Sequence, residues 1–481
     1  MPGFQSLRLD VLSPVDHSFP DYNPCYYLYF RSPSASDVRT SLQRGLEKLI
    51  KILPFITGEV VPCDGDRMEK RNGLLCIKYT ASPDESLPII EFREDMSLSV
   101  ENISTSKTRT GLEDVHLAKT LAPLPLTPNP SRPSYVVRFR ATTVRDGVVL
   151  AMSFSHFVFD ATGAGHLMEH FAECVREPEP KPCDIDQETL RQALWHINGD
   201  TGVIPNEPGD CHSLPAFMLP PGGREAIPEM AAPGMRVCRW KISAAKVELL
   251  KNTCNDLLRS LDYKAGDNSV NFLSSQDVLT GLLTTCLKHD PKGKVEGSDI
   301  GVAVNLRNRL SPEWPTGYFG NMAKYAIAPG LAEPTAEELA VAHRLVAENP
   351  KILPAASDIA RLYRNACSIR HTISQISDVH IRGFVSWLNS CKDLGPLTTP
   401  FPFINFTSWR HLNLYELDFG GALGYVDDIQ THGMMPTLGI ILPRAKAVQG
   451  TEAHWDVLFY VKNEDYPAVM KQGLLRFLTV D

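Results

Sequence analysis

Apolar side chains occupy every second position of the stretch that precedes His156. The alternating residues are Val148, Leu150, Met152 and Phe154. A period of two is typical of a β-strand with one buried face, and His156 falls on the same parity. The pattern therefore predicts a strand that carries a histidine at its end.

A helix is predicted directly after this strand, because apolar residues then recur at helical spacing. They are Ala164, Leu167, Met168, Phe171, Cys174 and Val175. Pro178 ends the pattern. We therefore expect His156 beside a helix N-terminus, where its imidazole can be held rigidly and still face a cavity.

The residues before this motif predict the rest of a first domain. Residues 25–30 form an aromatic run suited to a strand. An apolar stripe of helical spacing follows, at Val38, Leu42, Leu46, Leu49 and Leu53. The Asp146-Gly147 pair is a hairpin signal, so the strand that starts near Tyr135 should pair antiparallel with the strand that leads to His156.

A proline-rich connector is predicted at 177–236, because ten prolines interrupt any long element there. The stretch from Glu188 to Trp195 is free of proline and favours one short helix. The predicted organisation is an N-terminal domain at 1–176, a crossover linker at 177–236 and a C-terminal domain at 237–481.

The second half repeats the mixture of strands and helices. Strands are predicted at 237–242, 300–304, 437–442 and 455–461, and helices after residue 244, from Ser275 to Leu287, across 335–390 and from Tyr466 to Leu478. Mixed strands and helices with antiparallel hairpins predict an α/β fold with mixed sheets and two similar-sized domains.

Composition narrows the possible functions. The chain has 481 residues, a formal net charge of −8 and 43% hydrophobic residues, which is typical of a soluble globular protein and argues against bulk binding to nucleic acid or acidic membranes. We find no apolar 18-residue run and no secretory signal pattern, so a cytosolic location is expected. The eleven cysteines include no Cys-x-x-Cys pair, which predicts reduced thiols and no metal site.

The spacing His-x-x-x-Asp occurs three times, at His17, His156 and His196. With 14 histidines, about one match is expected by chance, so the spacing alone is weak. Only the match from His156 to Asp160 follows a predicted strand. The alternative for His156 is a core histidine that is hydrogen-bonded at a strand end.

Several short motifs follow His156 in a fixed order. They are His156-Phe157-Val158-Phe159-Asp160, Ser275-Gln276-Asp277-Val278-Leu279-Thr280, Asn305-Leu306-Arg307-Asn308-Arg309, Tyr318-Phe319-Gly320-Asn321, Thr407-Ser408-Trp409 and Asp418-Phe419-Gly420. This collinear set resembles the BAHD family of acyl-CoA-dependent acyltransferases, in a fungal branch similar to trichothecene 3-O-acetyltransferase. The resemblance implies two related domains of the chloramphenicol-acetyltransferase type, with acyl-CoA and an acceptor alcohol or amine entering an interface channel from opposite faces.

The sequence departs from the family pattern at two places, and it also differs from a related group of proteins. The family's Asp-Phe-Gly-Trp-Gly is followed here only as far as Gly420, since Gly421 replaces the aromatic residue. Asn305 stands where the family often has aspartate. Peptide-synthetase condensation domains share the fold but usually read His-His-x-x-x-Asp-Gly, which Ser155 and Ala161 do not match.

The resemblance suggests roles for the charged residues of these motifs. His156 is the predicted general base, because a neutral hydroxyl must lose its proton as it attacks a thioester. Asp160 could orient His156, but the family implies a structural ion pair with Arg307 or Arg309. Asp418 is the competing carboxylate for these arginines, and Gly420 is predicted to be structural.

The remaining candidates concern the cofactor. The resemblance places Trp409 near the thioester, where its indole N–H could donate to the oxyanion, with Thr407 or Ser408 beside the pantetheine arm. The alternative for Trp409 is an ordinary strand aromatic. Three further residues are weaker candidates for lining the cofactor side of the channel, and a role in core or loop packing is the favoured alternative for them. They are Ser275, Tyr318 and Asn321.

The sequence thus predicts a monomeric O-acyltransferase that uses acyl-CoA, with acetyl-CoA expected, and acts on a hydroxyl of a small secondary metabolite without a metal. N-acylation, a longer acyl group and an inactive ligand-binding member are the alternatives.

Overall fold

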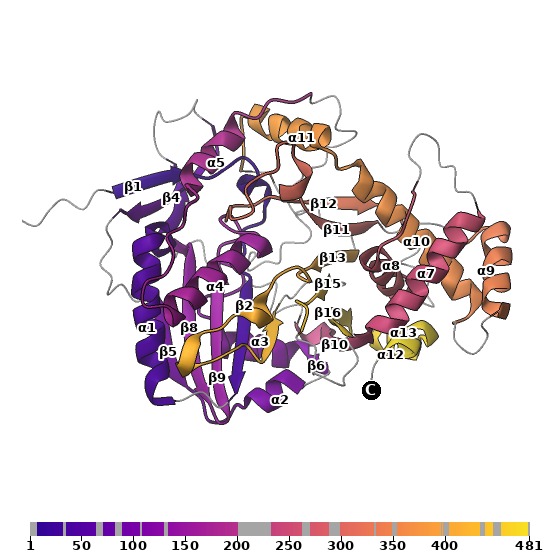
Figure 1. Cartoon of the computed structure of the whole chain (residues 1–481), viewed down its shortest axis with the longest axis horizontal. Coiled ribbons are helices and arrows are strands. Elements are labelled where there is room, and N and C mark those ends of the chain that lie inside the picture. The colour runs from indigo at the N-terminus through magenta and orange to yellow at the C-terminus, as the bar shows by residue number, and fades with distance from the viewer. Residues whose placement is uncertain are drawn as a thin grey trace, which may run out of the picture.

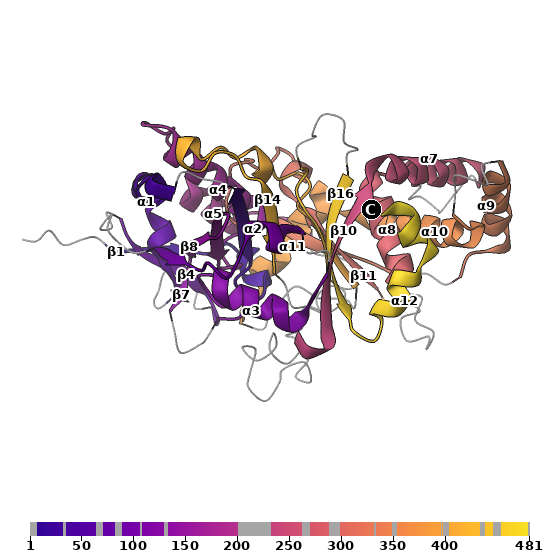
Figure 2. The same cartoon turned by 90° about the horizontal axis from the view of Figure 1, so that it is seen from below.

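The computed structural model describes the chain in fifteen segments. They are 7–31, 35–63, 71–81, 89–105, 108–128, 133–200, 232–261, 270–287, 299–330, 333–348, 354–395, 397, 404–432, 438–445 and 454–479. Two halves, each a sheet with helices, lie side by side (Figures 1 and 2).

A five-stranded sheet forms the first half, in the order β14-β2-β9-β8-β5. Its strands are β2 (Cys25–Arg31), β5 (Ile90–Glu94), β8 (Val137–Val144), β9 (Gly147–Phe154) and β14 (Asp428–Thr431). Strands β8 and β9 pair antiparallel from Val144 opposite Gly147, so the predicted hairpin is confirmed.

Helices cover both faces of this sheet, because alternate residues of its strands are apolar on both sides. Leu28 and Leu150 pack in one core with α1 (Ala35–Ile52) and α4 (Ala161–Arg176). Tyr27 and Val149 pack on the other face with α2 (Val100–Thr105) and α3 (Gly111–Leu121). The stripe predicted for α1 is buried throughout.

A smaller sheet adjoins the first half, with the order β1-β4-β3-β7. Its strands are β1 (Leu7–Val11), β3 (Glu59–Pro62), β4 (Leu75–Thr80) and β7 (Ser134–Tyr135). Helix α5 (Gln187–Trp195) contacts β1 and is the short helix predicted inside the connector. The predicted linker also includes 201–231, which lies outside the described residues.

A seven-stranded sheet forms the second half, in the order β12-β11-β13-β15-β16-β10-β6. Its strands are β6 (Thr108–Thr110), β10 (Met235–Ser243), β11 (Ile300–Asn305), β12 (Ala323–Ala328), β13 (Ile404–Ser408), β15 (Leu438–Ile441) and β16 (His454–Lys462). Strand β13 runs parallel to both β11 and β15, whereas the pairs made by β10, β12 and β16 are antiparallel. The mixed sheet agrees with the predicted class.

Seven helices accompany this sheet in the described segments. They are α7 (Ala244–Ser260), α8 (Ser275–Leu287), α9 (Ala336–Glu348), α10 (Ala356–Gln375), α11 (Asp378–Ser390), α12 (Tyr466–Lys471) and α13 (Gly473–Leu478). The single helix predicted from Tyr466 to Leu478 is wrong, because the backbone of Gln472 is extended, with ψ 124°, and separates α12 from α13. No helix in the described segments is long and apolar enough to cross a membrane.

Each half of the chain contributes a strand to the other half's sheet. Strand β14 pairs with β2, and β6 pairs with β10. The buried Arg239 of β10 donates to Asp428 of β14 at 2.6 Å and to Asp456 of β16 at 2.7 Å. The sheets therefore cross the predicted boundaries at 176 and 237, and a buried charge network holds the crossing.

Candidate active site

His156 lies two residues after the end of the buried strand β9, at the junction of the two halves. Its backbone N–H donates to the Tyr22 carbonyl at 3.0 Å, and its carbonyl accepts from Asn321 Nδ2 at 2.9 Å. The imidazole stacks on Phe19, with ring centroids 4.7 Å apart, and meets the Tyr22 ring edge-on at 4.8 Å. Two hydrogen bonds and two aromatic rings thus fix the orientation of this histidine.

The surroundings of His156 favour its neutral form. Burial lowers the pKa of His156, and this effect outweighs the opposing influence of its own backbone and of the Asp160 carboxylate. Nδ1 is buried and has no hydrogen-bond partner in the described part of the chain, while the side chain as a whole is partly exposed. A neutral imidazole near pH 7 can accept a proton, as a general base must.

Asp160 is the N-cap of α4 and one partner of a buried ion pair. Its Oδ1 accepts from the Gly163 N–H at 2.8 Å, and its Oδ2 accepts from the Met322 N–H at 2.9 Å. Arg307 donates to both oxygens. Burial alone would raise the pKa of Asp160, but Arg307 and these hydrogen bonds hold it below its ordinary value. Every bond of this carboxylate serves the scaffold, which fits the structural role implied by the family.

The two candidate arginines have different partners. Besides Asp160, Arg307 Nη2 donates to the carbonyls of Tyr318 and Gly320, at 3.0 and 2.8 Å. Arg309 instead donates to the carbonyls of Ile373 and Ile376 near the end of α10. The structure therefore pairs Asp160 with Arg307.

Close packing explains the small residues after Asp160. A Cβ on Gly163 would overlap the carbonyl of Phe319 and lie 3.0 Å from its Cα. Glycine therefore lets the first turn of α4 touch the loop whose carbonyls Arg307 binds.

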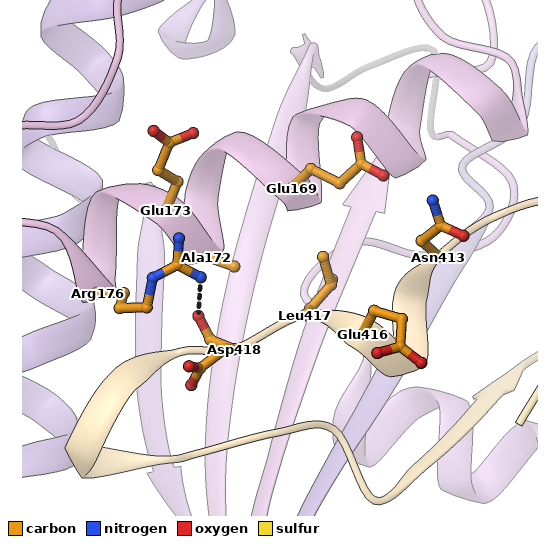
Figure 3. A pocket seen from close by; sticks show the side chains of 8 residues that line it. All are labelled: Glu169, Ala172, Glu173, Arg176, Asn413, Glu416, Leu417 and Asp418. Carbon is orange, nitrogen blue, oxygen red and sulfur yellow. Dashed lines mark hydrogen bonds between the residues drawn. The ribbon is translucent and has the colours of Figure 1, made fainter. Parts of the chain in front are cut away.

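Asp418 lies away from this pair, beside a surface pocket between α4 and the loop 413–418 (Figure 3). Its Oδ1 accepts from the Gly420 N–H, and its carbonyl accepts from Arg176 Nη1 at 3.5 Å. Gly420 has φ +71°, a conformation that favours glycine. A Cβ at Gly421, the position of the family's aromatic residue, would meet no atom within 4 Å and so lie in open space.

Trp409 follows β13 and is buried, with 6% of its surface exposed. Its ring meets Tyr26 edge-on at 5.0 Å, and Tyr26 in turn meets Phe154, two residues before His156, at 5.4 Å. Trp409 is thus joined to the histidine strand through Tyr26. Thr407 and Ser408, at the end of β13, are partly exposed.

The other cofactor candidates fall into two kinds. Ser275 begins α8 and is partly exposed. The side chains of Tyr318 and Asn321 are fully buried. Tyr318 packs against Trp314, and Asn321 bonds to Asp16 and to the His156 carbonyl. Their burial favours packing over direct contact with a cofactor.

Sequence reasoning missed the N-terminal segment that surrounds His156. Asp16, Phe19 and Tyr22 all come from this segment. The only sequence feature that marks this segment is the polar pair Asp16-His17 before an aromatic strand. That feature does not specify the contact between Asp16 and Asn321, which lies 305 positions further along the chain. A second cross-half contact was also missed, since Thr162 Oγ1 lies 2.9 Å from His411 Nε2.

The other two His-x-x-x-Asp matches do not resemble the His156 site. His17 is buried, and both of its ring nitrogens are bonded, Nδ1 to the Ser13 carbonyl and Nε2 to the Leu75 N–H. His196 is exposed and caps the C-terminus of α5. In the described segments, no cluster of His, Cys, Asp or Glu side chains could hold a metal ion.

Two family models match the chain. The Transferase family model covers residues 110–426, more than half of the sequence, and a trichothecene 3-O-acetyltransferase-like N-terminal domain covers residues 23–174. The chain belongs to this transferase family. The predicted family and the predicted enzyme class, an acyltransferase, are confirmed.

Curated relatives match over almost the whole length. A fumigaclavine B O-acetyltransferase of Aspergillus fumigatus is 30% identical, with 98% of this chain and 97% of the relative covered. A second fumigaclavine B O-acetyltransferase, from Penicillium roqueforti, is 26% identical, with 97% of each chain covered.

A solved structure confirms the predicted fold class. The crystal structure of F. sporotrichioides TRI101 complexed with coenzyme A and T-2 matches with a TM-score of 0.69. The match covers 98% of this chain and 99% of that one, at 15% identity.

Proposed function

We propose that this protein transfers an acetyl group from acetyl-CoA to a hydroxyl of a small fungal secondary metabolite, with His156 as the general base. The observation that carries the proposal is the geometry of His156. It is a fixed imidazole of lowered pKa at the junction of the two halves. The names of the relatives support an O-acetyl transfer, and the coenzyme A in the TRI101 crystal supports an acyl-CoA donor.

The chemistry follows from the environment of the imidazole. Because Nδ1 is buried, Nε2 is the nitrogen that meets the acceptor. Nε2 takes the hydroxyl proton as the oxygen bonds to the thioester carbonyl carbon. The carbon–sulfur bond then breaks, and the same proton passes to the departing thiolate. No covalent acyl-enzyme is needed.

The tetrahedral intermediate requires a donor at its oxyanion. Trp409 is the candidate, because it follows the β13 strand end and shares Tyr26 with the histidine strand. The partly exposed Thr407 and Ser408 are proposed to lie along the pantetheine arm. A cytosolic location and a monomeric state stay predictions.

The test is an acetyl transfer assay with purified protein. We expect coenzyme A release that depends on acceptor, and acetylated product by mass spectrometry, with fumigaclavine B as the first acceptor tried. Parallel reactions with amine acceptors and longer acyl-CoAs distinguish the alternatives. No transfer to any acceptor, with coenzyme A still bound, would favour the inactive ligand-binding member.

A further inference from the structure

Asp16 lies in the short 3-10 helix η1 (Asp16–Ser18) and is completely buried. Its carboxylate accepts three N–H bonds. Oδ2 accepts from the Ser13 N–H at 2.8 Å, and Oδ1 accepts from the Asn321 N–H at 2.9 Å and from Asn321 Nδ2 at 2.8 Å. These accepted bonds hold Ser13 and Asn321 in one orientation relative to the carboxylate.

Asn321 carries this constraint to the histidine. The same Nδ2 group that donates to Asp16 also donates to the His156 carbonyl at 2.9 Å. An amide nitrogen has two hydrogens, and here each has one acceptor. The Asp16 carboxylate therefore sets the orientation of the amide that holds the His156 backbone.

The segment that contains Asp16 also holds the ring of His156. Phe19 stacks on the imidazole, and Tyr22 meets its edge and accepts from its backbone N–H. Both residues lie within six positions of Asp16 along the chain. A displacement of η1 would therefore reach the imidazole by two routes, through the Asn321 amide and through the aromatic rings.

The crossover connector supports the carboxylate. Arg191 of α5 is fully buried, and its Nε lies 3.9 Å from Asp16 Oδ2. Its guanidinium faces the Phe55 ring at 5.4 Å. Burial raises the pKa of Asp16, and Arg191 with the N–H donors opposes that rise. The pKa of Asp16 is raised overall, and Arg191 favours the charged form of this carboxylate against the effect of burial.

We propose that Asp16 is a positioning residue, which acts through Asn321 to hold the carbonyl and ring of His156 in the orientation that proton transfer requires. The proposal rests on the function proposed for His156. A small displacement of a reacting group costs a large factor in rate, so this arrangement should affect kcat more than substrate binding.

The contrasting role is purely structural. Asp16 and Asn321 come from different halves of the chain, so their bond could simply hold the halves together. In that case, variants would lose folded protein, but each folded molecule would turn over at the wild-type rate. The maximal rate divided by the concentration of folded sites, which is kcat per folded site, separates the two roles.

The main variant is Asn321→Leu, which keeps the side-chain size and removes both donated bonds. We expect kcat per folded site to fall about 10- to 100-fold, with the KM for acetyl-CoA within about threefold of wild type. Asp16→Ala should lower kcat similarly. Asp16→Asn should retain part of the rate, because it keeps an oxygen that can face Asn321.

The matched control is Asn365→Leu. Asn365 is 5% exposed and donates to Thr285 at 3.0 Å, between α10 and α8, without any contact to His156. It should lose stability like Asn321→Leu and keep the wild-type kcat. Coenzyme A binding by calorimetry counts the folded sites, and a thermal melt measures stability in every variant.

The outcomes separate the two proposals. In the first outcome, wild type transfers acetyl groups and His156→Ala does not, so the proposed function stands. If both Asn321→Leu and Asp16→Asn then keep kcat within threefold of wild type, the positioning role of Asp16 is overturned. If His156→Ala keeps the wild-type rate, the assignment of His156 as the general base is rejected before the role of Asp16 is considered. If Asn321→Leu fails to fold, Asp16→Ala decides, and a wild-type kcat in folded Asp16→Ala rejects the proposal.

Discussion

Arg307 donates hydrogen bonds to both carboxylate oxygens of Asp160, at 2.8 and 3.1 Å, across the junction between the two halves. Asp160 caps α4 of the first half, and Arg307 follows β11 of the second half. Asp160 lies four residues after His156 in the sequence. One ion pair therefore joins the halves next to the residue proposed for catalysis.

Asp160→Asn should destabilise the protein, because it leaves the buried Arg307 without its charge partner. Loss of one partner of a buried pair typically costs about 3–5 kcal/mol of unfolding free energy. Chemical denaturation measures this change. The control is Glu333→Gln, whose exposed pair with Arg361 should contribute about 1 kcal/mol or less. A variant as stable as wild type but inactive would instead support a catalytic orienting role for Asp160.

His156→Ala should fold and bind coenzyme A, yet lose transfer. Its side chain is partly exposed, so its removal leaves little unfilled core. We expect kcat to fall about 10² to 10⁴-fold, which is the usual contribution of a general base. The KM for acyl-CoA should change little, since the lost interaction exists mainly in the transition state. Near wild-type kcat in the folded variant would place the chemistry elsewhere.

The pH at which activity is lost on the acid side should lie below the ordinary pKa of histidine. Burial lowers the pKa of His156, so its neutral, proton-accepting form persists below pH 6.5. The rate constant kcat/KM should fall only as the pH drops through that lowered value. Initial rates between pH 4.5 and 8.5, with a melt at each pH, measure this loss. A midpoint at or above 6.5 would contradict the buried environment described for this imidazole.

Trp409→Phe should distinguish the contribution of the indole N–H from that of aromatic packing. Phenylalanine keeps an aromatic contact with Tyr26 but cannot donate a hydrogen bond. If Trp409 stabilises the oxyanion, kcat should fall about 10²-fold or more, with a modest loss of stability. An unchanged kcat would make Trp409 an ordinary packing residue. Ser408→Ala tests the neighbouring position, and there we expect a change mainly in the KM for acetyl-CoA.

Local patterns were sufficient to predict most of the fold and the position of His156 just after a buried strand. The alternation before His156, the Asp146-Gly147 turn and the stripe of α1 all depend on neighbours in sequence, and the structure has each of them. These features are predictable because strand, turn and helix periodicity are set within a few residues.

Long-range pairing could not be predicted in this way. Strand β14 joins β2 although about 400 residues separate their paired positions, and no local pattern specifies that partner. The choice of Arg307 over Arg309 depends on which side chain of η7 (Arg307–Arg309) faces α4. The contact from Asp16 to Asn321 likewise exists only once the two halves have met.

His17 should make the stability of the protein depend on pH. Its Nδ1 is bonded to the Ser13 carbonyl and its Nε2 to the Leu75 N–H, so the neutral ring donates from Nδ1 and accepts at Nε2. A second proton would face the Leu75 N–H. Burial accordingly lowers the pKa of His17 to about 4.

The sign of this dependence follows from the two states. Between about pH 6.5 and 4 the unfolded chain binds a proton at His17 and the folded chain does not, so stability is complete above 6.5 and falls as the pH drops. The slope should be about 1.4 kcal/mol per pH unit for this residue. His17→Gln, which can still donate and accept, should reduce the slope of unfolding free energy against pH by that amount. An unchanged slope would mean that His17 titrates alike in both states, and the remaining slope should then be sought in His432, whose pKa burial also lowers to about 4.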